Sequence, residues 1–422
     1  MAVPERLTSP APVPVLVGGD IGAYALVRAF YERFGVRGVV LAMRATKAFA
    51  HTRLAEVRVA NVDDEESLIQ ELLTLARERK AAGRPADERL ILLTNADHYV
   101  EAIVRNRARL EAHFAIPMCS PEALARVSSK KAFDEDCRAL GIPVPEGVAL
   151  DFSTANPGRD DTLLDSFTYP IFGKPSSSAE YYGVDFVGKQ KVYHLETRED
   201  AASLLARLRG SGYRGVFMLQ EFIPGDETQM RSLTAYRDSQ GRVTLLCTGR
   251  VLLEEHTPGA LGIPAAILTE PFPDAMDAIT RYLDRIDYRG FANADYKWDA
   301  RTGRHVFFEV NPRVGRNNYY ATAAGADLAG HVAADVAGEP MEPVRASREV
   351  LYSVVPLRLL TRYLLDRGLR RRVVRAARRG MARPLFAPAD RSPRRLVEIA
   401  AHTLNHIRKF RRYYPRPTDT GF

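Results

Sequence analysis

Residues 306–320 read VFFEVNPRVGRNNYY, and this stretch carries the clearest indication of the fold. Its first positions are apolar and aromatic, which is typical of a buried β-strand. Glu309, Asn311 and Arg313 then occupy alternate positions, and the two-residue period of an extended chain puts all three side chains on one face. A carboxylate, an amide and a guanidinium in line indicate a polar site at the end of a core strand.

The preceding strand, FANADYKW, adds a second carboxylate, Asp295. A hairpin through the turn DARTG is expected to bring Asp295 close to Glu309. Asp295, Glu309 and Asn311 offer the oxygen ligands that Mg²⁺ takes together with nucleotide phosphates. Two adjacent carboxylates need such a counter-charge, and Arg313 is expected to stabilise a phosphoryl group in the same pocket. The alternative is a structural salt-bridge network.

A lysine ends another apolar run, FTYPIFGKPSSS. Lys174 leaves the predicted core strand beside hydroxyl groups, a combination suited to gripping a phosphate. The hydroxyl-bearing candidates are Ser176 and Ser177. The alternative is a strand-end lysine that reaches solvent.

The segment LQEFIPGDE is a strand that runs into a turn. We expect the backbone of a strand edge here to recognise an adenine ring, and Glu227 after the turn to accept hydrogen bonds from ribose hydroxyls. An ordinary acidic surface turn is the alternative. The residues of this candidate adenine segment are Gln220, Glu221, Phe222 and Ile223.

The N-terminal part of the chain alternates strand and helix patterns. VPVLVGGDIGAYALVRAFYERFG predicts strand, turn and helix, and RLILLTNADHYVEAIVRN predicts a second such unit. This pattern indicates a parallel α/β domain over residues 1–125, whose ligands collect at the carboxyl ends of the strands. The turn GGDIGAY lacks the GxGxxG spacing, so a tight turn that needs glycine is favoured over a dinucleotide site, although it could receive part of another substrate.

A chain of 422 residues is too long for one core, and a second domain is expected after the first. The segment SSKKAFDEDCRALGIPVPEG predicts a helix that Ser128 or Ser129 caps and Gly141 ends. Strand patterns then dominate, which predicts an α+β domain over residues 126–345. Residues 346–422 are expected to be a basic helical region.

The charge is uneven along the chain. Residues 345–422 hold 20 Lys plus Arg against 5 Asp plus Glu, a net of +15 within a total of +8, so the remainder is acidic. The basic region could be solvated helices that pack on the body, or a contact with an anionic membrane surface. Nucleic-acid binding is disfavoured, because no recognisable nucleic-acid-binding motif accompanies the charge.

The segment HTLNH places His402 and His406 at a spacing that can bind a metal, but the sequence supplies no third ligand.

The remaining composition points to the cytoplasm. Cys119, Cys137 and Cys247 are odd in number and without CxxC spacing, which is typical of reduced thiols. The sequence shows no apolar run of transmembrane length and no secretory signal pattern. We therefore expect a cytoplasmic protein that could associate with a membrane through its basic region.

In combination, these motifs resemble the ATP-grasp superfamily over residues 10–345. Lys130, eleven residues before Gly141, matches the family's first nucleotide lysine, and Lys174 matches the second. QEFIPGDE matches the adenine and ribose segment, and the three candidate metal ligands match the family's magnesium ligands in order. The resemblance implies ATP and Mg²⁺ as cofactors.

Three segments resemble the D-aspartate ligase branch of that superfamily. They are GGDIGAYALVRAFYERFG, the serine- and tyrosine-containing KPSSSAEYYG, and LLEEHTPGALG. The resemblance implies an acylphosphate mechanism that joins the side-chain carboxylate of D-aspartate to the lysine amine of a nucleotide-linked muramyl peptide. Peptidoglycan synthesis would be the setting.

The resemblance also implies roles for individual residues. Lys130 and Lys174 would hold the phosphates, Arg313 would stabilise the transferred phosphoryl group, and residues 176–188 would close as a lid. The proton acceptors considered are Glu254, Glu255 and His256, and the clamps considered for the donor's carboxylates are Arg231, Arg250 and Arg316. The alternatives are a ligase for another amino acid or small carboxylate, and a non-catalytic nucleotide-binding protein.

Overall fold

The structure, a computed structural model, describes residues 12–82, 88–154, 162–176, 181, 183–190, 192–258 and 260–418. It divides into two compact units. Unit 1 comprises Met1–Leu124, Asp226–Ala294 and Asn311–Phe422, and unit 2 comprises Ala125–Gly225 and Asp295–Val310. The predicted borders at residues 125 and 345 divide the chain along its length, whereas each unit is assembled from separate segments, so those domain borders stay a prediction.

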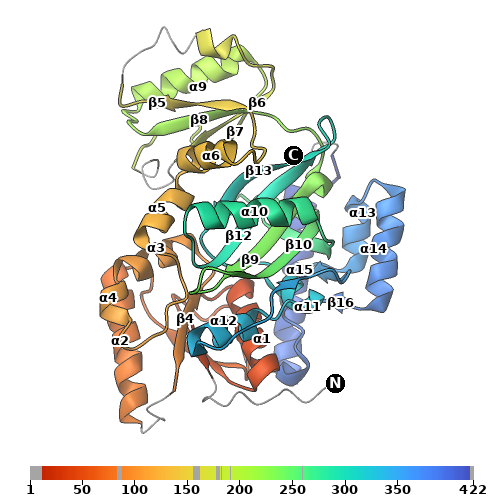
Figure 1. Cartoon of the computed structure of the whole chain (residues 1–422). Coiled ribbons are helices and arrows are strands. Elements are labelled where there is room, and N and C mark those ends of the chain that lie inside the picture. The colour runs from red at the N-terminus through yellow and green to blue at the C-terminus, as the bar shows by residue number, and fades with distance from the viewer. Residues whose placement is uncertain are drawn as a thin grey trace. The chain divides into compact units, whose positions relative to one another are not determined.

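The N-terminal part of unit 1 is the expected parallel α/β layer (Figure 1). Its sheet has the order β3 (Ala55–Val59), β2 (Gly38–Ala42), β1 (Val13–Val17) and β4 (Leu90–Thr94). The helices of this layer are α1 (Ile21–Phe34), α2 (Glu65–Ala81), α3 (Asp97–Arg105) and α4 (Arg107–Leu110). Alternation along β1 explains the layering, because Leu16 packs with α1 on one face while Val15 and Val17 pack with α2 and α3 on the other.

A large, mostly antiparallel sheet adjoins this layer. Its order is β13 (Arg304–Asn311), β12 (Gly290–Asp299), β9 (Met230–Arg237), β10 (Val243–Glu254), β11 (Pro264–Thr269), β15 (Leu351–Ser353) and β16 (Met381–Ala382), with β14 (Val344–Arg345) paired to β10. One apolar core joins α1 to strands β9, β10 and β11 and to helices α11 (Tyr319–Ala324) and α12 (Leu328–Ala337). Helix α10 (Pro273–Arg285) contacts β10, and β12 and β13 each run from one unit into the other.

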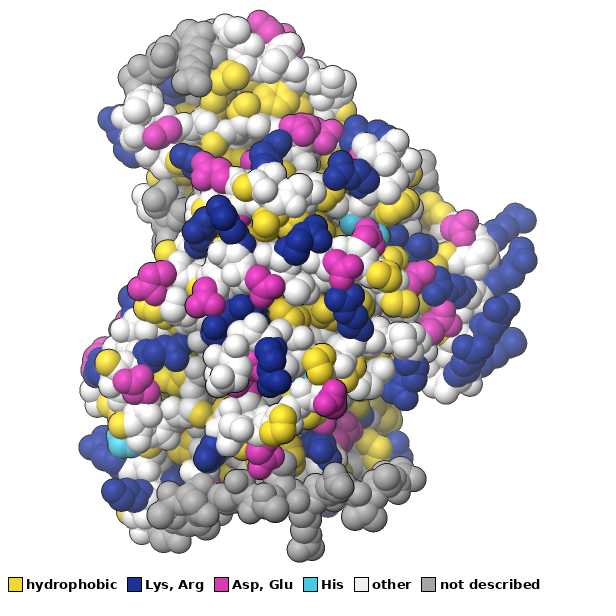
Figure 2. Space-filling model, in the orientation of Figure 1, with side chains coloured by type: hydrophobic (Ala, Val, Ile, Leu, Met, Phe, Trp, Pro, Cys, Tyr) yellow, Lys and Arg dark blue, Asp and Glu magenta, His cyan; other side chains and the backbone are white. Residues whose placement is uncertain are grey.

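The C-terminal region is helical, as expected, and it is packed on the rest of unit 1. It contains α13 (Leu357–Tyr363), α14 (Arg367–Arg379), the short η2 (Pro388–Asp390) and α15 (Pro393–Tyr413). Ile399 joins the core of the N-terminal layer, and Phe410 joins a second core with β11 and α14. Dark blue basic side chains gather over α14 (Figure 2). Among the described helices, none combines the length and apolarity needed to cross a membrane.

Unit 2 contains a small antiparallel sheet. Its order is β5 (Gly147–Asp151), β8 (Val216–Glu221), β6 (Ile171–Pro175) and β7 (Tyr193–Leu195), and α9 (Arg198–Gly210) covers one face (Figure 1). A capping box of Thr197 and Asp200 begins α9. Helix α6 (Lys130–Ala139) also belongs to this unit, while α5 (Pro121–Ser128) crosses the border between the units.

All three cysteines are buried and free, as the scattered spacing predicted. Burial raises the pKa of Cys119 to about 11, because a thiolate would lose its hydration there. These thiols are therefore packing residues.

Candidate active site

The first candidate nucleotide-binding element in unit 2 is the start of α6. Ser129 caps this helix by accepting a hydrogen bond from the Ala132 amide, which settles the choice between the two predicted serines. Gly141 follows the helix with a φ of 65°, as expected for a glycine that ends it. Ser176 Oγ, just beyond β6, accepts a hydrogen bond from the Lys131 amide at 3.3 Å. The end of β6 is thereby tied to the first turn of α6.

Lys174 lies near charged side chains from separate segments of unit 2. Burial lowers its pKa to about 8; the nearby carboxylate of Glu309 opposes this effect and the ammonium of Lys130 reinforces it. Side chains from α6 and β13 therefore lie close enough to Lys174 on β6 to act on its charge. Such a cluster suits a polyanion with its counter-ion, since a phosphate would relieve the repulsion between the lysines.

The two predicted carboxylate ligands stand on neighbouring strands, Asp295 on β12 and Glu309 on β13. Both side chains are half-buried. Over the described part of the chain, no three His, Cys, Asp or Glu side chains gather into a metal site. Two carboxylates fit Mg²⁺ that takes its other ligands from phosphates and water, and they do not fit an all-protein cage.

Lys297, two positions after Asp295 on β12, is a residue that the sequence interpretation missed. Its Nζ donates to the carbonyl oxygens of Ile223 and Gly225 at 2.8 and 2.6 Å, and its side chain is buried. It also lies over the ring of Phe222 at 5.5 Å. The signal was present, because Lys297 continues the alternate polar positions of its strand.

The candidate adenine segment needs one correction. β8 lies between β5 and β6, so Gln220 and Glu221 are in an interior strand and their backbone pairs on both sides, contrary to the expected strand edge. The chain leaves the sheet after Glu221, and Phe222 and Ile223 follow. Phe222 packs against the rings of Phe172 and His194 at 5.5 and 5.4 Å. The sequence could not reveal the interior position, because strand order depends on distant partners.

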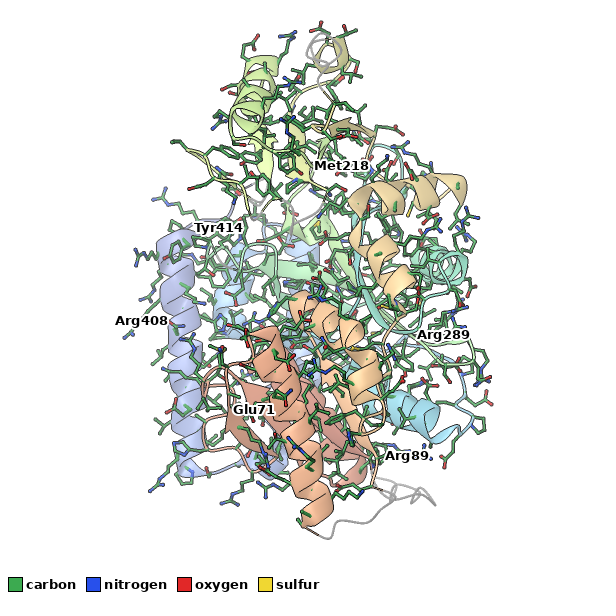
Figure 3. The ribbon with its side chains drawn as sticks, turned by 90° about the vertical axis from the view of Figure 1, so that its left-hand side faces the viewer. Glu71, Arg89, Met218, Arg289, Arg408 and Tyr414 are labelled. Carbon is green, nitrogen blue, oxygen red and sulfur yellow. The ribbon has the colours of Figure 1, made fainter. Side chains whose placement is uncertain are left out.

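Glu227, the expected ribose residue, is in unit 1 at the start of the short η1 (Glu227–Gln229). Its Oε2 accepts a hydrogen bond from the Glu254 amide at 2.7 Å and lies 3.3 Å from His256 Nε2. Burial raises the pKa of Glu227, and these two contacts oppose the rise. The His256 ring stacks at 3.6 Å on Tyr414, which lies at the end of α15 (Figure 3).

Asn311 and Arg313 belong to unit 1, where β13 ends. Pro312, which has no amide hydrogen, ends the strand between them. Arg313 Nη2 donates to Asn311 Oδ1 at 3.1 Å and to Asp97 at 3.2 Å, and its Nε lies 3.1 Å from the same carboxylate. The two side chains share a face, and Asp97 at the start of α3 orients the guanidinium.

The GGDIGAY turn supports the same region of unit 1. Gly18 has a φ of 111°, as a tight turn requires, and Asp20 Oδ1 caps α1. Asn95, at the end of the neighbouring strand β4, donates to the same oxygen at 2.8 Å. At Gly22, a Cβ atom would lie 2.5 Å from Asn95 Nδ2 and 2.7 Å from the Arg316 carbonyl oxygen. This glycine allows the segment after β13 to approach α1.

The three candidate carboxylate clamps have different surroundings. Arg231 is buried and donates to the carbonyl oxygens of Thr228 and Met230. Arg250 lies 3.6 Å from Glu270. Arg316 lies between Asp20 and Glu255 and keeps 29% of its side chain exposed.

The three candidate proton acceptors do not form one cluster. His256 faces Glu227, whereas Glu255 faces Arg316 and α15. Glu254, the last residue of β10, is half-buried. Ser177 lies outside the described residues, as do parts of the 176–188 segment expected to form a lid.

Similarity to known proteins decides the family. Residues 129–343 match the family model for the carbamoyl-phosphate synthase L chain, ATP binding domain. The chain is 30% identical to a D-aspartate ligase of Enterococcus faecium (strain Aus0004) over 420 residues, which covers 95% of this chain and 96% of that protein. It belongs to the ATP-grasp superfamily of carboxylate-amine ligases.

Solved ATP-grasp proteins share the fold. N5-carboxyaminoimidazole ribonucleotide synthetase of Thermus thermophilus superposes with a TM-score of 0.54 at 22% identity, covering 80% of this chain and 81% of that one. Biotin carboxylase of Campylobacter jejuni gives 0.56 at 14% identity, covering 80% and 73%. Membership of this ligase superfamily, shown by the family model and by the D-aspartate ligase relative, makes the chain an ATP-dependent enzyme that forms a carbon–nitrogen bond rather than a non-catalytic nucleotide-binding protein.

Proposed function

We propose that this ATP-grasp ligase adds D-aspartate, through its side-chain carboxylate, to the lysine amine of a nucleotide-linked muramyl peptide. The observation that carries the proposal at the site is the electrostatic cluster of Lys130, Lys174 and Glu309. Similarity to a D-aspartate ligase over nearly the whole chain supports the choice of donor. A ligase for another amino acid or small carboxylate is the alternative.

The reaction proceeds through an acylphosphate, because a carboxylate and an amine do not condense usefully in water. The donor carboxylate attacks the γ-phosphorus of ATP and ADP leaves; the amine then attacks the carbonyl carbon, and phosphate and a proton leave. Lys130 and Lys174 hold the polyphosphate, and Arg313 stabilises the transferred phosphoryl group. Phe222 and Ile223 border the adenine, and Glu227 receives the ribose.

Asp295, Glu309 and Asn311 are the residues that would hold Mg²⁺. When bound, the ion supplies charge compensation for the polyphosphate. The Lys174 ammonium lies near Glu309, so this carboxylate has a cationic neighbour of its own within unit 2. The hydrogen bond of Ser176 holds the end of β6 against α6. It thereby keeps Lys174 and Lys130 close to each other.

The test is phosphate release from ATP and magnesium with a panel of D- and L-amino acids. The acceptor is a lysine-containing UDP-linked muramyl pentapeptide, and mass spectrometry identifies the product. A D-aspartate-dependent mass gain of one residue supports donor and acceptor together. Ligation of another amino acid would overturn the D-aspartate assignment, and ligation to a different amine would overturn the acceptor.

We also propose that the basic region draws the enzyme to anionic membrane surfaces. Exposed arginines line α14, and attraction to anionic lipid adds up over several such charges. Sedimentation with vesicles of anionic and of neutral lipid tests this proposal. Equal sedimentation with both vesicle types would refute it.

A further inference from the structure

We propose that Arg316 binds a carboxylate of one substrate, and that helix α15 positions this arginine through the buried Glu255. The proposal rests on the ligase function above and deepens it. The carboxylate could be the α-carboxylate of the amino-acid donor or a carboxylate of the acceptor peptide. Both have the same chemistry, and the experiment below distinguishes them.

On one side, Arg316 is held by Asp20 in the GGDIGAY turn between β1 and α1. Its Nε donates to Asp20 Oδ2 at 3.1 Å. The other oxygen of Asp20 accepts hydrogen bonds from the amides of Gly22 and Ala23 and from Asn95 Nδ2. Because these bonds fix Asp20, the carboxylate is a rigid support for the guanidinium.

Arg316 is held from another side by Glu255. Its Nη1 lies 3.8 Å from Glu255 Oε1, and the Glu255 side chain is only 2% exposed. A guanidinium has five donor hydrogens in a planar fork. With Asp20 and Glu255 on part of that fork and 29% of the side chain exposed, the remaining donors can meet a carboxylate in bidentate fashion.

The C-terminal helix completes the support around Glu255. His406 Nδ1 lies 3.2 Å from Glu255 Oε1, and Lys409 Nζ lies 3.9 Å from Oε2. These residues are one turn apart on α15, so both reach the same carboxylate. A buried carboxylate needs such partners, because without them it would lose its hydration uncompensated. The last helix of the chain therefore helps to set the position of Arg316.

The surroundings of Arg316 favour it over the other arginines. Arg231 is 2% exposed and donates to backbone carbonyl oxygens, so a substrate has little access to it. Arg250 shares Glu270 with Arg372, which belongs to α14. Arg316 instead follows Arg313 by three residues and bonds to Asp20 in the GGDIGAY turn, for which the sequence left open a contact with part of a substrate.

The experiment measures KM for each substrate and kcat in full-length variants. Arg316→Lys keeps the charge and removes the fork, Arg316→Gln removes both, and Lys409→Met removes one support of Glu255. Arg408→Met is the matched control, because Arg408 is the neighbouring residue on α15 and its side chain points outward (Figure 3). Lys409→Arg tests rescue.

We expect Arg316→Gln to raise the KM of one substrate about tenfold or more and Arg316→Lys to recover only part of it. Lys409→Met is expected to raise the same KM a few-fold with little change in kcat, Lys409→Arg to restore it, and Arg408→Met to leave both constants unchanged. An effect on the amino-acid KM identifies the donor's carboxylate, and an effect on the peptide KM identifies the acceptor's. Unchanged KM values for both substrates in folded Arg316→Gln would overturn the proposal.

A separate readout distinguishes failure of this inference from failure of the proposed function. If the wild-type enzyme ligates none of the amino acids tested, calorimetry measures binding of D-aspartate, and separately of the UDP-linked peptide, to the ATP-saturated protein. If Arg316→Gln weakens this binding, the carboxylate site is supported although the proposed reaction is rejected. Binding that Arg316→Gln leaves unchanged, or no binding of either compound to the wild type, would overturn the carboxylate site as well.

Discussion

At the scale of one residue, Glu309 illustrates how the two-residue period of a strand places a carboxylate in the candidate site. It lies on the polar face of β13, and its charge acts on Lys174 in the neighbouring sheet of the same unit. We expect Glu309→Gln to lower ATP turnover about a hundredfold or more, because the amide keeps the shape and loses the charge that a metal needs. The melting temperature should stay near that of the wild type. Phosphate-release assays and thermal unfolding measure the two quantities, and normal turnover in the folded variant would remove the metal role.

Gly22 is one of the residues at which the packing leaves no room for a side chain. A methyl group there would press on Asn95 and on the Arg316 backbone. We expect Gly22→Ala to lower the free energy of unfolding by about 1–3 kcal/mol, as overpacking does. Gly210→Ala is the control, since a Cβ at Gly210 meets nothing within 4 Å. Urea unfolding of both variants tests the comparison, and equal stabilities would contradict the tight approach.

At the scale of one element, helix α15 carries two histidines that are withdrawn from solvent, His406 buried and His402 half-buried. Burial, with His406 and Arg316 acting in the same direction, lowers the pKa of His402 to about 4, while an unfolded histidine titrates near 6.5. The unfolded state binds the proton more readily between these values. The stability that the folded protein keeps while His402 is neutral is therefore fully present above about pH 6.5. It is lost as the pH falls toward 4.

The corresponding variant is His402→Gln, which removes the titrating ring. The loss of unfolding free energy between pH 7.5 and pH 5 is expected to be smaller than in the wild type, by about 1 kcal/mol. His113→Gln, at an exposed position, is the control and should keep the wild-type dependence. Urea unfolding at both pH values gives the numbers, and identical slopes for all three proteins would mean that His402 is protonated equally in both states.

At the scale of the whole molecule, the C-terminal region behaves as part of the body. The charge pattern alone left two readings open for this region, solvated helices that pack on the body or a contact with an anionic membrane surface. In the structure, β15 pairs with β11, and Arg395 is buried and donates to backbone carbonyl oxygens of Lys47 and Ala50. We expect the truncated chain to lose its cooperative unfolding transition, because the two cores of unit 1 that contain Ile399 and Phe410 lose part of their cover. Circular dichroism and size exclusion test this, and a folded, monodisperse fragment would show that the region is separable.

The sequence allowed us to predict those features of the site that depend on residues close together along the chain. Alternation predicted that Asn311 and Arg313 share a face, and capping rules located the start of α6. Lys297 was overlooked although it shares the polar face of β12, because its partners, the carbonyl oxygens of Ile223 and Gly225, lie far away along the chain. The interior position of β8 was also inaccessible, since strand order is a property of distant pairings.

The sequence by itself determined the fold class and the family, because strand and helix periods and the spacing of motif residues are local. Only the tertiary structure decided that Arg316 meets Asp20, 296 positions away, and that Glu255 meets His406 on the last helix. Such contacts depend on how buried faces close over one another. Basic residues on an amphipathic helix look alike in sequence whether they face solvent, as Arg408 does, or a buried carboxylate, as Lys409 does. Desolvation of Glu255 distinguishes them, and that exists only in the folded chain.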